Sequence, residues 1–570
     1  MTRYLQKYFH SPFDNFSPAE GRKESTCSDS LAFTLSLTIE GESHQVPGAN
    51  IKQCELRAFS YGFDCVLGFY LPNDQRKDDL FTAFTSESLI TVELGITGVI
   101  NMPKPPPKIF KVTGLVKDKS LSELAYRQIT GNPVLYRYYQ IEFADPAQVL
   151  WQQHYPCELY VKDSMSSVIN AQVVSPIALT IDFAAADQVQ PLICLALGNA
   201  EKNSPGETGV SNHASFYDFL MDYCDKINAF FVYDYAKQNY CLKGDSPDLE
   251  TGTAFLPHEI SDFKIYWPAQ KRSTTNLLNG IAEGSKQSAI ENKNAVAGIK
   301  QDIVLRQAIE SQFSERNTRE TNKVSILGEQ LDVHFSQWPM QTFWPNCELS
   351  FNSTVDGKKY FYTDKSYRSY AFFISAKAKD NTPEQDLDLP FTQYELQYQV
   401  LAHNSTIEQP ILPLYQKPFY PLYIEGVIVS EQGNDDEKTF DVVSNTETGQ
   451  FEYKVHIPLW DKTIQIMLEP DFINSHFYFP FFRGVKLLLS LELHRAHIQK
   501  VLSWGEGVQL PLATQGNHIL FGKKMGDETS LSHVYEDSKP VFAIKRSKDK
   551  DTELMRMEEG TIIFQTCEEE

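Results

Sequence analysis

Two histidines three residues apart are the first candidates for chemistry. His494 and His497 occur in the segment LELHRAHIQK, and a pair of imidazoles can bind a transition metal. Because this segment alternates like a β-strand, the two side chains are expected on opposite faces. The chain lacks the H-E-x-x-H pattern of zinc hydrolases, and no third ligand accompanies the pair. The sequence therefore predicts no metal site here.

Carboxylates are the next candidates, because general acid–base catalysis uses carboxylates whose pKa is shifted by burial or close pairing. Asp435 and Asp436 stand in EQGNDDEK, a turn-rich segment that favours a solvated loop. Asp145, placed between an aromatic strand and Pro146, is a further candidate acid. The catalytic motif G-x-S-x-G and the nucleotide-binding motifs G-x-x-x-x-G-K-[ST] and G-x-G-x-x-G are absent. We therefore expect no catalytic, cofactor-binding or metal-binding residues, no cofactor, and no enzymatic activity.

The composition describes a large folded protein. A length of 570 residues suggests roughly three to five domains, and hydrophobic residues make up 42% of the chain. Acidic residues outnumber basic residues by 74 to 52, which leaves a net charge of −22. Such a chain repels phosphate backbones, so we expect no nucleic-acid partner.

The start of the chain and its cysteines indicate the compartment of synthesis. The N-terminal residues MTRYLQKYFHSPFDNF contain no apolar core of the kind that marks a secretory signal. The nine cysteines are scattered, with no C-x-x-C pair, and reduced thiols are the rule in the cytoplasm. We expect a protein that is made in the cytoplasm.

Strands dominate the first part of the chain. The segments LAFTLSLTIEG, CELRAFSYGFDCVLGFYLP and SLITVELGITGVI alternate β-branched or aromatic residues with other residues and end at Gly, Pro, Asn or Asp. Evenly spaced strands of this kind are typical of a β-barrel.

The pattern changes at Asp145-Pro146. Proline fits the first turn of a helix, so a strand is expected to end there and a short helix to begin. Asp163 is then positioned to cap a second helix, which carries Met165, Val168 and Ile169 on one face. This predicts an α/β piece inserted in a β domain.

A third helix is expected to begin at Ser215, which forms a capping box with Asp218. After Asn228 the pattern AFFVYDY, turn, NYCL predicts a hairpin. Residues 278–325 contain few aromatic residues, and a solvated helix or a mobile loop is expected. Strand patterns return after residue 330.

This succession of pieces resembles the hub of the VgrG spike proteins of type VI secretion and of contractile phage tails. Tyr136 to Pro146, Asp163 to Val168 and Ser215 to Tyr233 occupy the places of that family's strand, helix start, and helix with hairpin. Asn228-Ala229 departs from the family by replacing the glycine at the hairpin entry. Further along, TQYELQYQVLAH with PFYPLYIEGVIVSEQG is similar to the family's passage into an OB-type barrel, and GEGVQLPLATQGNHILFG is similar to the start of its needle.

The resemblance implies a mainly β fold with α/β insertions, in which hub β-barrels and an OB-like barrel lead to the start of a trimeric β-prism needle. It divides the chain into an N-terminal arm (1–30), a first hub β-barrel (31–150), an inserted α/β piece (151–214), a second hub β-barrel region (215–415) with the polar segment 278–325, an OB-like barrel (416–504) and a β-prism needle segment (505–570).

The same resemblance implies a structural function. The chain would be the central spike of a contractile injection system, a homotrimer that couples the inner tube to a piercing needle and delivers effectors across a target envelope. Its partners would be an Hcp-like tube protein, a PAAR-like conical tip protein, baseplate proteins and effector cargo. It would be assembled in the bacterial cytoplasm and ejected with the tube into the medium or a target cell, or belong to a virion-like particle.

Several alternatives remain open at this stage. A β-rich carbohydrate hydrolase would use Trp and Tyr as sugar platforms and two carboxylates as catalysts. An adhesion module is the other alternative, and the lack of an export signal disfavours it. Within the spike family, the sequence is compatible with type VI secretion, an extracellular injection particle or a prophage tail. Strands from residue 505 onward are too polar and short to stand as an isolated sheet, which favours intertwining of three copies.

Overall fold

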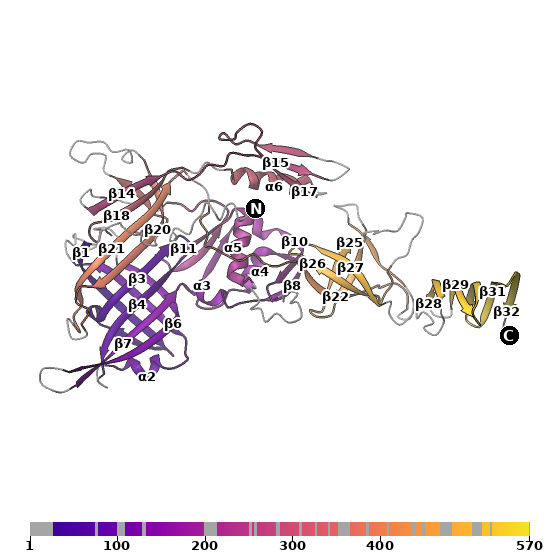
Figure 1. Ribbon diagram of the computed structural model, residues 1–570, viewed down its shortest axis with the longest axis horizontal. Coiled ribbons are helices and arrows are strands. Elements are labelled where there is room, and N and C mark those ends of the chain that lie inside the picture. Colours follow the sequence, from indigo (N-terminus) through magenta and orange to yellow (C-terminus); the bar gives the residue numbers. More distant parts are fainter. Residues whose placement is uncertain are drawn as a thin grey trace. The chain divides into compact units, whose positions relative to one another are not determined.

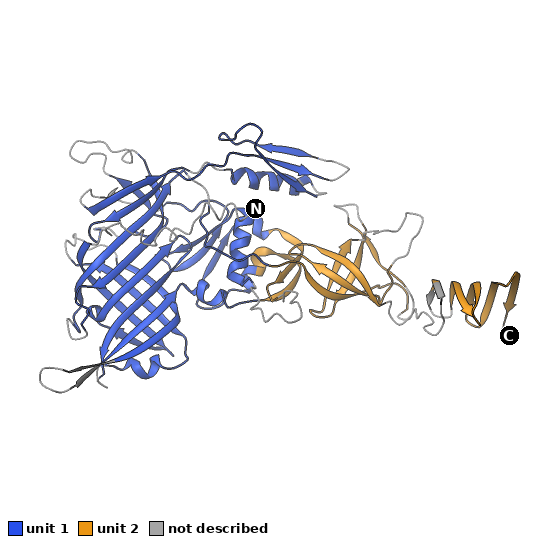
Figure 2. Ribbon diagram, viewed as in Figure 1, with its two compact units in different colours: residues 1–155, 169–187, 212–418 blue, residues 156–168, 188–211, 419–570 orange. Residues whose placement is uncertain are grey.

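The chain folds mainly as β-sheet with a few short helices, as predicted. By contacts within the chain it divides into two compact units, residues 1–155, 169–187 and 212–418 (unit 1) and residues 156–168, 188–211 and 419–570 (unit 2) (Figure 2). The computed structural model describes residues 27–73, 78–99, 109–127, 133–198, 214–249, 254–255, 259–280, 286–306, 310–324, 328–339, 343–351, 365–382, 387–406, 410–434, 439–445, 451–467, 481–503, 516–524 and 527–568. Among the described helices, no apolar stretch reaches the length needed to span a membrane.

A closed ring of antiparallel strands forms the centre of unit 1. The ring closes because β20 and β21 pair with each other as well as with β3 and β1 (Figure 1). Alternate residues of β1, from Leu31 to Ile39, are at most 3% exposed, which is the two-residue period expected for an inward face. The ring runs through β1 (Cys27–Ile39), β5 (Ile90–Gly98), β6 (Phe110–Arg127), β7 (Pro133–Ala144), β4 (Gly62–Pro72), β3 (Ile51–Phe59), β20 (Tyr367–Ala378) and β21 (Phe391–Asn404).

A second sheet of unit 1 shares the β20–β21 hairpin. Strand β21 pairs with β1 through residues 391–396 and with β18 through residues 399–403, so one hairpin belongs to both assemblies. The second sheet has the order β13 (Ala254–Phe255), β19 (Glu348–Phe351), β20, β21, β18 (Gln330–Phe335), β14 (Ile260–Tyr266). Short elements complete the region around the ring: β2 (Glu42–Val46), the 3-10 turn η1 (Gly48–Asn50) and α2 (Leu80–Phe84).

Helices α3 and α5 occupy the places that the sequence indicated, whereas α2 was not predicted. Helix α3 (Pro146–Trp151) follows β7, and helix α5 (Phe216–Ile227) precedes the hairpin of β11 (Phe230–Asp234) and β12 (Asn239–Lys243). Strand β9 (Leu179–Asp182) runs parallel to β12, and the 3-10 turn η2 (Ala184–Asp187) follows it. The capping box of Ser215 and Asp218 is present as predicted. Asn228 ends α5 at φ 59°; asparagine tolerates this left-handed conformation, which explains how the chain dispenses with glycine there.

The predicted cap of helix α4 (Met165–Ala171) was wrong by one residue. Asp163 lies in β8 (Cys157–Ser164), and its side chain accepts a hydrogen bond from the Ser164 backbone, 2.8 Å away. The Ser164 hydroxyl instead accepts from the Ser167 backbone N–H at 3.2 Å. The predicted apolar face is correct, because Met165, Val168 and Ile169 are all buried.

The polar segment 278–325 belongs to a small α/β element of unit 1, which we call the module (residues 274–324). It contains β15 (Thr274–Asn279), β16 (Gln287–Ile290), β17 (Lys300–Leu305) and α6 (Glu310–Asn322). The expected helix is present at its C-terminal end. The two short strands β16 and β17 were missed, because only one or two apolar residues alternate in each.

Unit 2 combines a hairpin from the middle of the chain with a C-terminal sheet. Strands β8 and β10 (Val189–Ala196) pair with each other, and Leu159, Leu192 and Cys194 share a core with Tyr453 and Leu487. The sheet has the order β23 (Val442–Ser444), β24 (Phe451–Ile457), β22 (Leu422–Ile428), β26 (Lys486–Leu491), β27 (Ala496–Ser503), with β25 (Lys462–Met467) on β24. Residues 151–214 are thus divided between the two units.

The C-terminal strands form a separate antiparallel sheet in which every strand pairs with the next. Two-residue turns join the last four strands, and their first residues, Asp537, Asp549 and Glu559, have positive φ, as hairpin turns of this length require. We call this sheet the needle sheet: β28 (Gly516–Lys524), β29 (Asp527–Glu536), β30 (Lys539–Lys548), β31 (Asp551–Glu558) and β32 (Thr561–Cys567).

Candidate assembly interface

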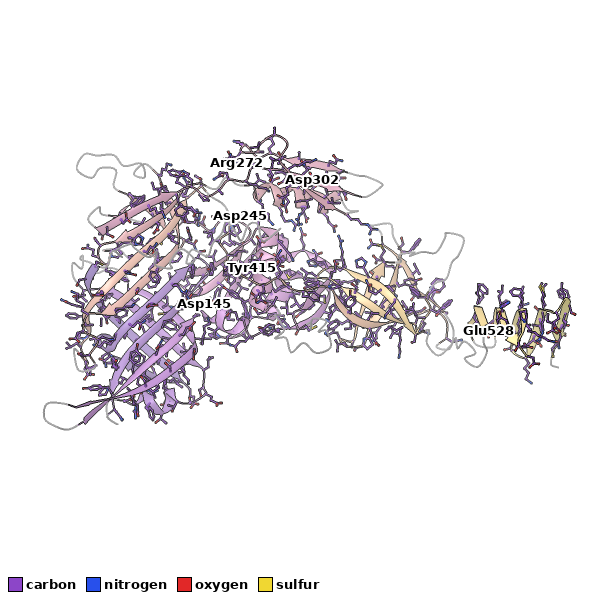
Figure 3. All side chains as sticks on the ribbon, viewed as in Figure 1. Asp145, Asp245, Arg272, Asp302, Tyr415 and Glu528 are labelled. Atoms are coloured by element: carbon purple, nitrogen blue, oxygen red, sulfur yellow. The ribbon has the colours of Figure 1, made fainter. Side chains whose placement is uncertain are left out.

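Asp145 is the candidate acid that the structure places most clearly, at a junction of three elements in unit 1 (Figure 3). Its side chain is fully buried. One carboxylate oxygen, Oδ1, accepts from the backbone N–H of Gln148 at 3.0 Å and from the Tyr240 hydroxyl at 2.5 Å. The other, Oδ2, accepts from the backbone N–H of Phe63 at 3.1 Å. The carboxylate therefore joins the starts of α3 and β4 to β12.

Local backbone geometry fits this role. Asp145 is the N-cap of α3, and Pro146 occupies the first turn, where the missing N–H of proline is harmless. Gly62 has φ 153°, and a Cβ at that position would lie 2.3 Å from Oδ2 of Asp145. A larger residue cannot occupy position 62 without displacing the carboxylate.

The environment of Asp145 favours its protonated form. Burial raises the pKa of Asp145 to about 6, and the hydrogen bonds from Tyr240, Gln148 and Phe63 act in the opposite direction. Tyr235 beside it is also satisfied internally, because its hydroxyl bonds to the backbone of Phe59 and Gly62. A carboxyl group with no solvent access and three protein donors serves to hold the strand-to-helix corner together.

The other candidates are not brought together into a site. The His494 side chain contacts the Leu192 carbonyl through Nδ1 at 3.2 Å, in the turn before β27, and His497 lies within β27. Asp435 and Asp436 fall outside the described residues. Within the described ranges, no three His, Cys, Asp or Glu side chains form a group that could hold a metal ion. The expectation that the chain has no catalytic or cofactor-binding residue stays a prediction.

The needle sheet is the part of the chain that is least complete by itself. Among its described residues, only Val534 and Val541 are buried. Phe564 is 76% exposed and Ile562 is 56% exposed. A sheet normally buries at least one face against another layer, and this sheet supplies almost no core of its own.

Strand register shows that the apolar residues of the needle sheet share one face. Directly paired residues of antiparallel strands point to the same side. A row of cross-strand partners runs across all five strands of the sheet, and the members of this apolar row are Ile519, Leu531, Ile544, Met555 and Phe564. Phe542, Met557 and Ile562 form a second apolar row on the same face.

The opposite face of the needle sheet is more polar. Its strands place Ser532, Ala543, Arg556 and Ile563 in register, and Arg556 pairs with Glu536 and Glu558 at 2.5 and 2.6 Å. The two buried residues, Val534 and Val541, also point to this face. The two faces therefore differ in character, and the apolar face is the candidate interface. The sequence indicated that these strands cannot form a stable sheet alone, but the residues of the apolar face were not predicted. The two-residue alternation in VFAIKRS and ELMRME is the signal that indicates this face.

Comparison with known proteins agrees with this architecture. No family model and no curated protein sequence matches the chain. Among solved structures, a chain of a PdpA-VgrG complex in a lidless form superposes with a TM-score of 0.69 and 13% identity over 96% of this chain and 100% of that one. The fold is that of a PdpA-VgrG complex component.

A lidded form of the Francisella PdpA-VgrG complex gives a similar result, with a TM-score of 0.68 and 13% identity over 99% of this chain and 83% of that one. A tail protein from Neisseria meningitidis MC58 matches with a TM-score of only 0.40 over 66% of this chain, at 10% identity, which is too low to bear on the fold. The resemblance to spike proteins predicted from the sequence is thus confirmed at the level of the fold.

Proposed function

We propose that the chain is the central spike of a contractile injection system and acts as a homotrimer. The observation that carries the proposal is the needle sheet, which has one apolar face and almost no core. Its apolar row of Ile519, Leu531, Ile544, Met555 and Phe564 crosses all five strands. Three copies of such a face, turned toward a common axis, would supply the missing core and close the heterologous contacts in a ring.

The edge strands of the needle sheet support the same proposal. Strand β32 is an edge of the sheet, and all seven of its residues are exposed. An exposed edge that carries Ile562, Ile563 and Phe564 invites pairing with another chain. Pairing among three copies satisfies these backbone groups in a closed assembly, which avoids open-ended aggregation.

Unit 1 supports the role of a hub. One hairpin, β20–β21, belongs both to the closed ring and to the second sheet, so each chain presents two joined β assemblies. Three chains then present six, which suits a hexameric tube ring of an Hcp-like protein. A PAAR-like tip protein, baseplate proteins and effector cargo complete the proposed partners, in a particle assembled in the bacterial cytoplasm and ejected with its tube.

The test is the oligomeric state of the intact chain. We expect native mass spectrometry and light scattering to give a trimer, and we expect Ile544→Asp on the apolar face to give monomers that keep the folded barrel. Ala543→Asp is the matched control, because the neighbouring residue lies on the opposite face of the same strand. A stable monomer of the unmodified chain at micromolar concentration would refute the proposal.

A further inference from the structure

The module has a core of its own within unit 1. Leu277 of β15, Ile290 of β16 and Phe313 of α6 are buried against one another. Ile303, Leu305 and Val324, which are partly buried, complete this cluster, and every member of it lies between residues 274 and 324. Figure 1 shows β15, β17 and α6 gathered as one element. Most apolar residues of the module therefore pack within the module, and only Val324 among this cluster also lines the cleft beside it.

The contact between the module and the neighbouring part of unit 1 is polar and incompletely packed. A cleft of about 510 Å³ separates them. Its walls include Glu291, Asn292 and Thr321 from the module, and Asn228 and Asp245 from the segments after α5 and β12; Figure 3 labels Asp245. The cleft is open to solvent, and its walls are mainly polar, although Phe230 and Val324 also line it; such a cleft is filled with water.

Opposite charges meet beside the cleft. Asn322 and Val324, on either side of Lys323, line the cleft together with Asn228, which follows α5. Asp225 in the last turn of α5 attracts Lys323, the residue after α6. Removal from water lowers the pKa of Lys323, while the charges of Glu320 and Asp225 act in the opposite direction. Asp225 is itself fixed in place, because its Oδ2 accepts a hydrogen bond from the Tyr415 hydroxyl at 2.8 Å.

We propose that the module is a reversibly docked arm, held beside α5 by the attraction between Lys323 and Asp225 and able to swing away to open the cleft. Three observations lead to this conclusion: a separate core, a water-filled and mainly polar cleft, and opposite charges on the two elements beside it. Partly exposed charge pairs stabilise a contact only modestly and are screened by salt. Undocking would leave the core of the module and the ring of unit 1 intact.

Salt provides the first test on the unmodified chain. Raising NaCl from about 0.02 M to about 0.5 M shortens the Debye length from roughly 20 Å to roughly 4 Å. We expect hydrogen–deuterium exchange to become at least about threefold faster in the last turns of α5 and α6, while β3 and β4 of the ring keep their rates. Equal protection of α5 and α6 at the two salt concentrations would overturn the proposal.

Charge reversal provides the second test. Lys323→Glu should accelerate exchange in α5 and α6 at low salt, and the double variant Lys323→Glu with Asp225→Lys should restore protection. Lys300→Glu is the control: it changes the charge of the module equally, but Lys300 faces Asp302 within the module, 3.5 Å away. Failure of the double variant to recover protection would contradict the proposal. Should a variant fail to fold, as judged by its melting curve, the salt experiment decides. Both tests are independent of the oligomeric state and hence of the proposed function.

Discussion

The ring of unit 1 and the needle sheet differ in how they pair their edge strands and bury their apolar faces. Every strand of the ring has a partner on both sides, and its inward residues, such as Leu37 and Ile141, are fully buried. Among the described strands, β28 and β32 of the needle sheet each pair on one side only, and Ile519, Ile562 and Phe564 of its apolar face are exposed. The ring closes within one chain, whereas the needle sheet supplies little core of its own, and this difference is the basis of the proposed trimer.

The largest expected effect comes from a charge in the ring. Ile141→Asp in β7 places an unpaired carboxylate at a site with no solvent exposure, which should destabilise unit 1 by about 4 kcal/mol or more. We expect loss of the folded ring in urea unfolding and circular dichroism. The contrast with Ile544→Asp is decisive: that change should abolish assembly and leave the ring folded. If both variants unfolded the ring equally, the claim that the ring folds independently of the needle sheet would be wrong.

A pH-dependent effect at Asp145 should be somewhat smaller. The folded-state pKa is about 6, against an ordinary value of 3.8, so the folded chain binds more protons than the unfolded chain between these values. The contribution of Asp145 to stability is therefore greatest below about pH 4 and falls as pH rises through about 6, by roughly 3 kcal/mol.

Asp145→Asn removes this dependence. Relative to the unmodified chain, the variant should gain roughly 2.4 kcal/mol in free energy of unfolding between pH 4 and pH 8, measured by urea titration at each pH. Asp163→Asn, at a half-exposed position of β8, is the matched control. If the difference in free energy of unfolding between Asp145→Asn and the unmodified chain stayed constant with pH, the pKa of Asp145 would be the same in the folded and unfolded states.

A loss of about 1 kcal/mol is expected when the capping box of α5 is broken. Ser215→Ala removes the oxygen that accepts from the Asp218 backbone at 3.2 Å. Thermal melting of the intact chain measures the change, and Ser215→Thr, which retains the hydroxyl, should restore most of the stability. If Ser215→Thr lost as much stability as Ser215→Ala, the loss would come from packing around residue 215 rather than from the helix cap.

The smallest effect is expected from exposed ion pairs on the needle sheet. Arg546 and Glu553 pair at 3.2 Å, with more than half of each side chain in water, and such pairs contribute little. Arg546→Ala should leave the melting temperature of the assembled protein unchanged within error. A clear drop would mean that charge, and not the apolar face, holds the sheet together.

Local signals in the sequence predicted where helices and strands begin and end far better than which strands pair with one another. The corner at Asp145-Pro146 and the capping box at Ser215 follow from residue chemistry within a few positions, and both are confirmed. The cap of α4 was assigned to Asp163 rather than Ser164, because both residue types cap helices equally well.

Long-range pairings could not be derived in the same way. The ring closes only when β20 and β21, more than 200 residues after β7, pair with β3 and β1, and no local pattern encodes that pairing. Tyr240 reaches the carboxylate of Asp145 across 95 positions of the sequence and was likewise invisible. The needle face was within reach of sequence reasoning, since alternation alone places Ile544 and Phe542 on one side.

The hairpin of β8 and β10 has a consequence for how such a chain can evolve. This hairpin shares a core with β22, β24 and β26, yet its residues lie between two stretches of unit 1 in the sequence. A single recombination joint near residue 418 would give a hybrid whose Leu159 and Cys194 meet side chains from a foreign sheet. Recombination between related chains should therefore preserve residues 27–503 as a block, or exchange the needle sheet from Gly516 onward.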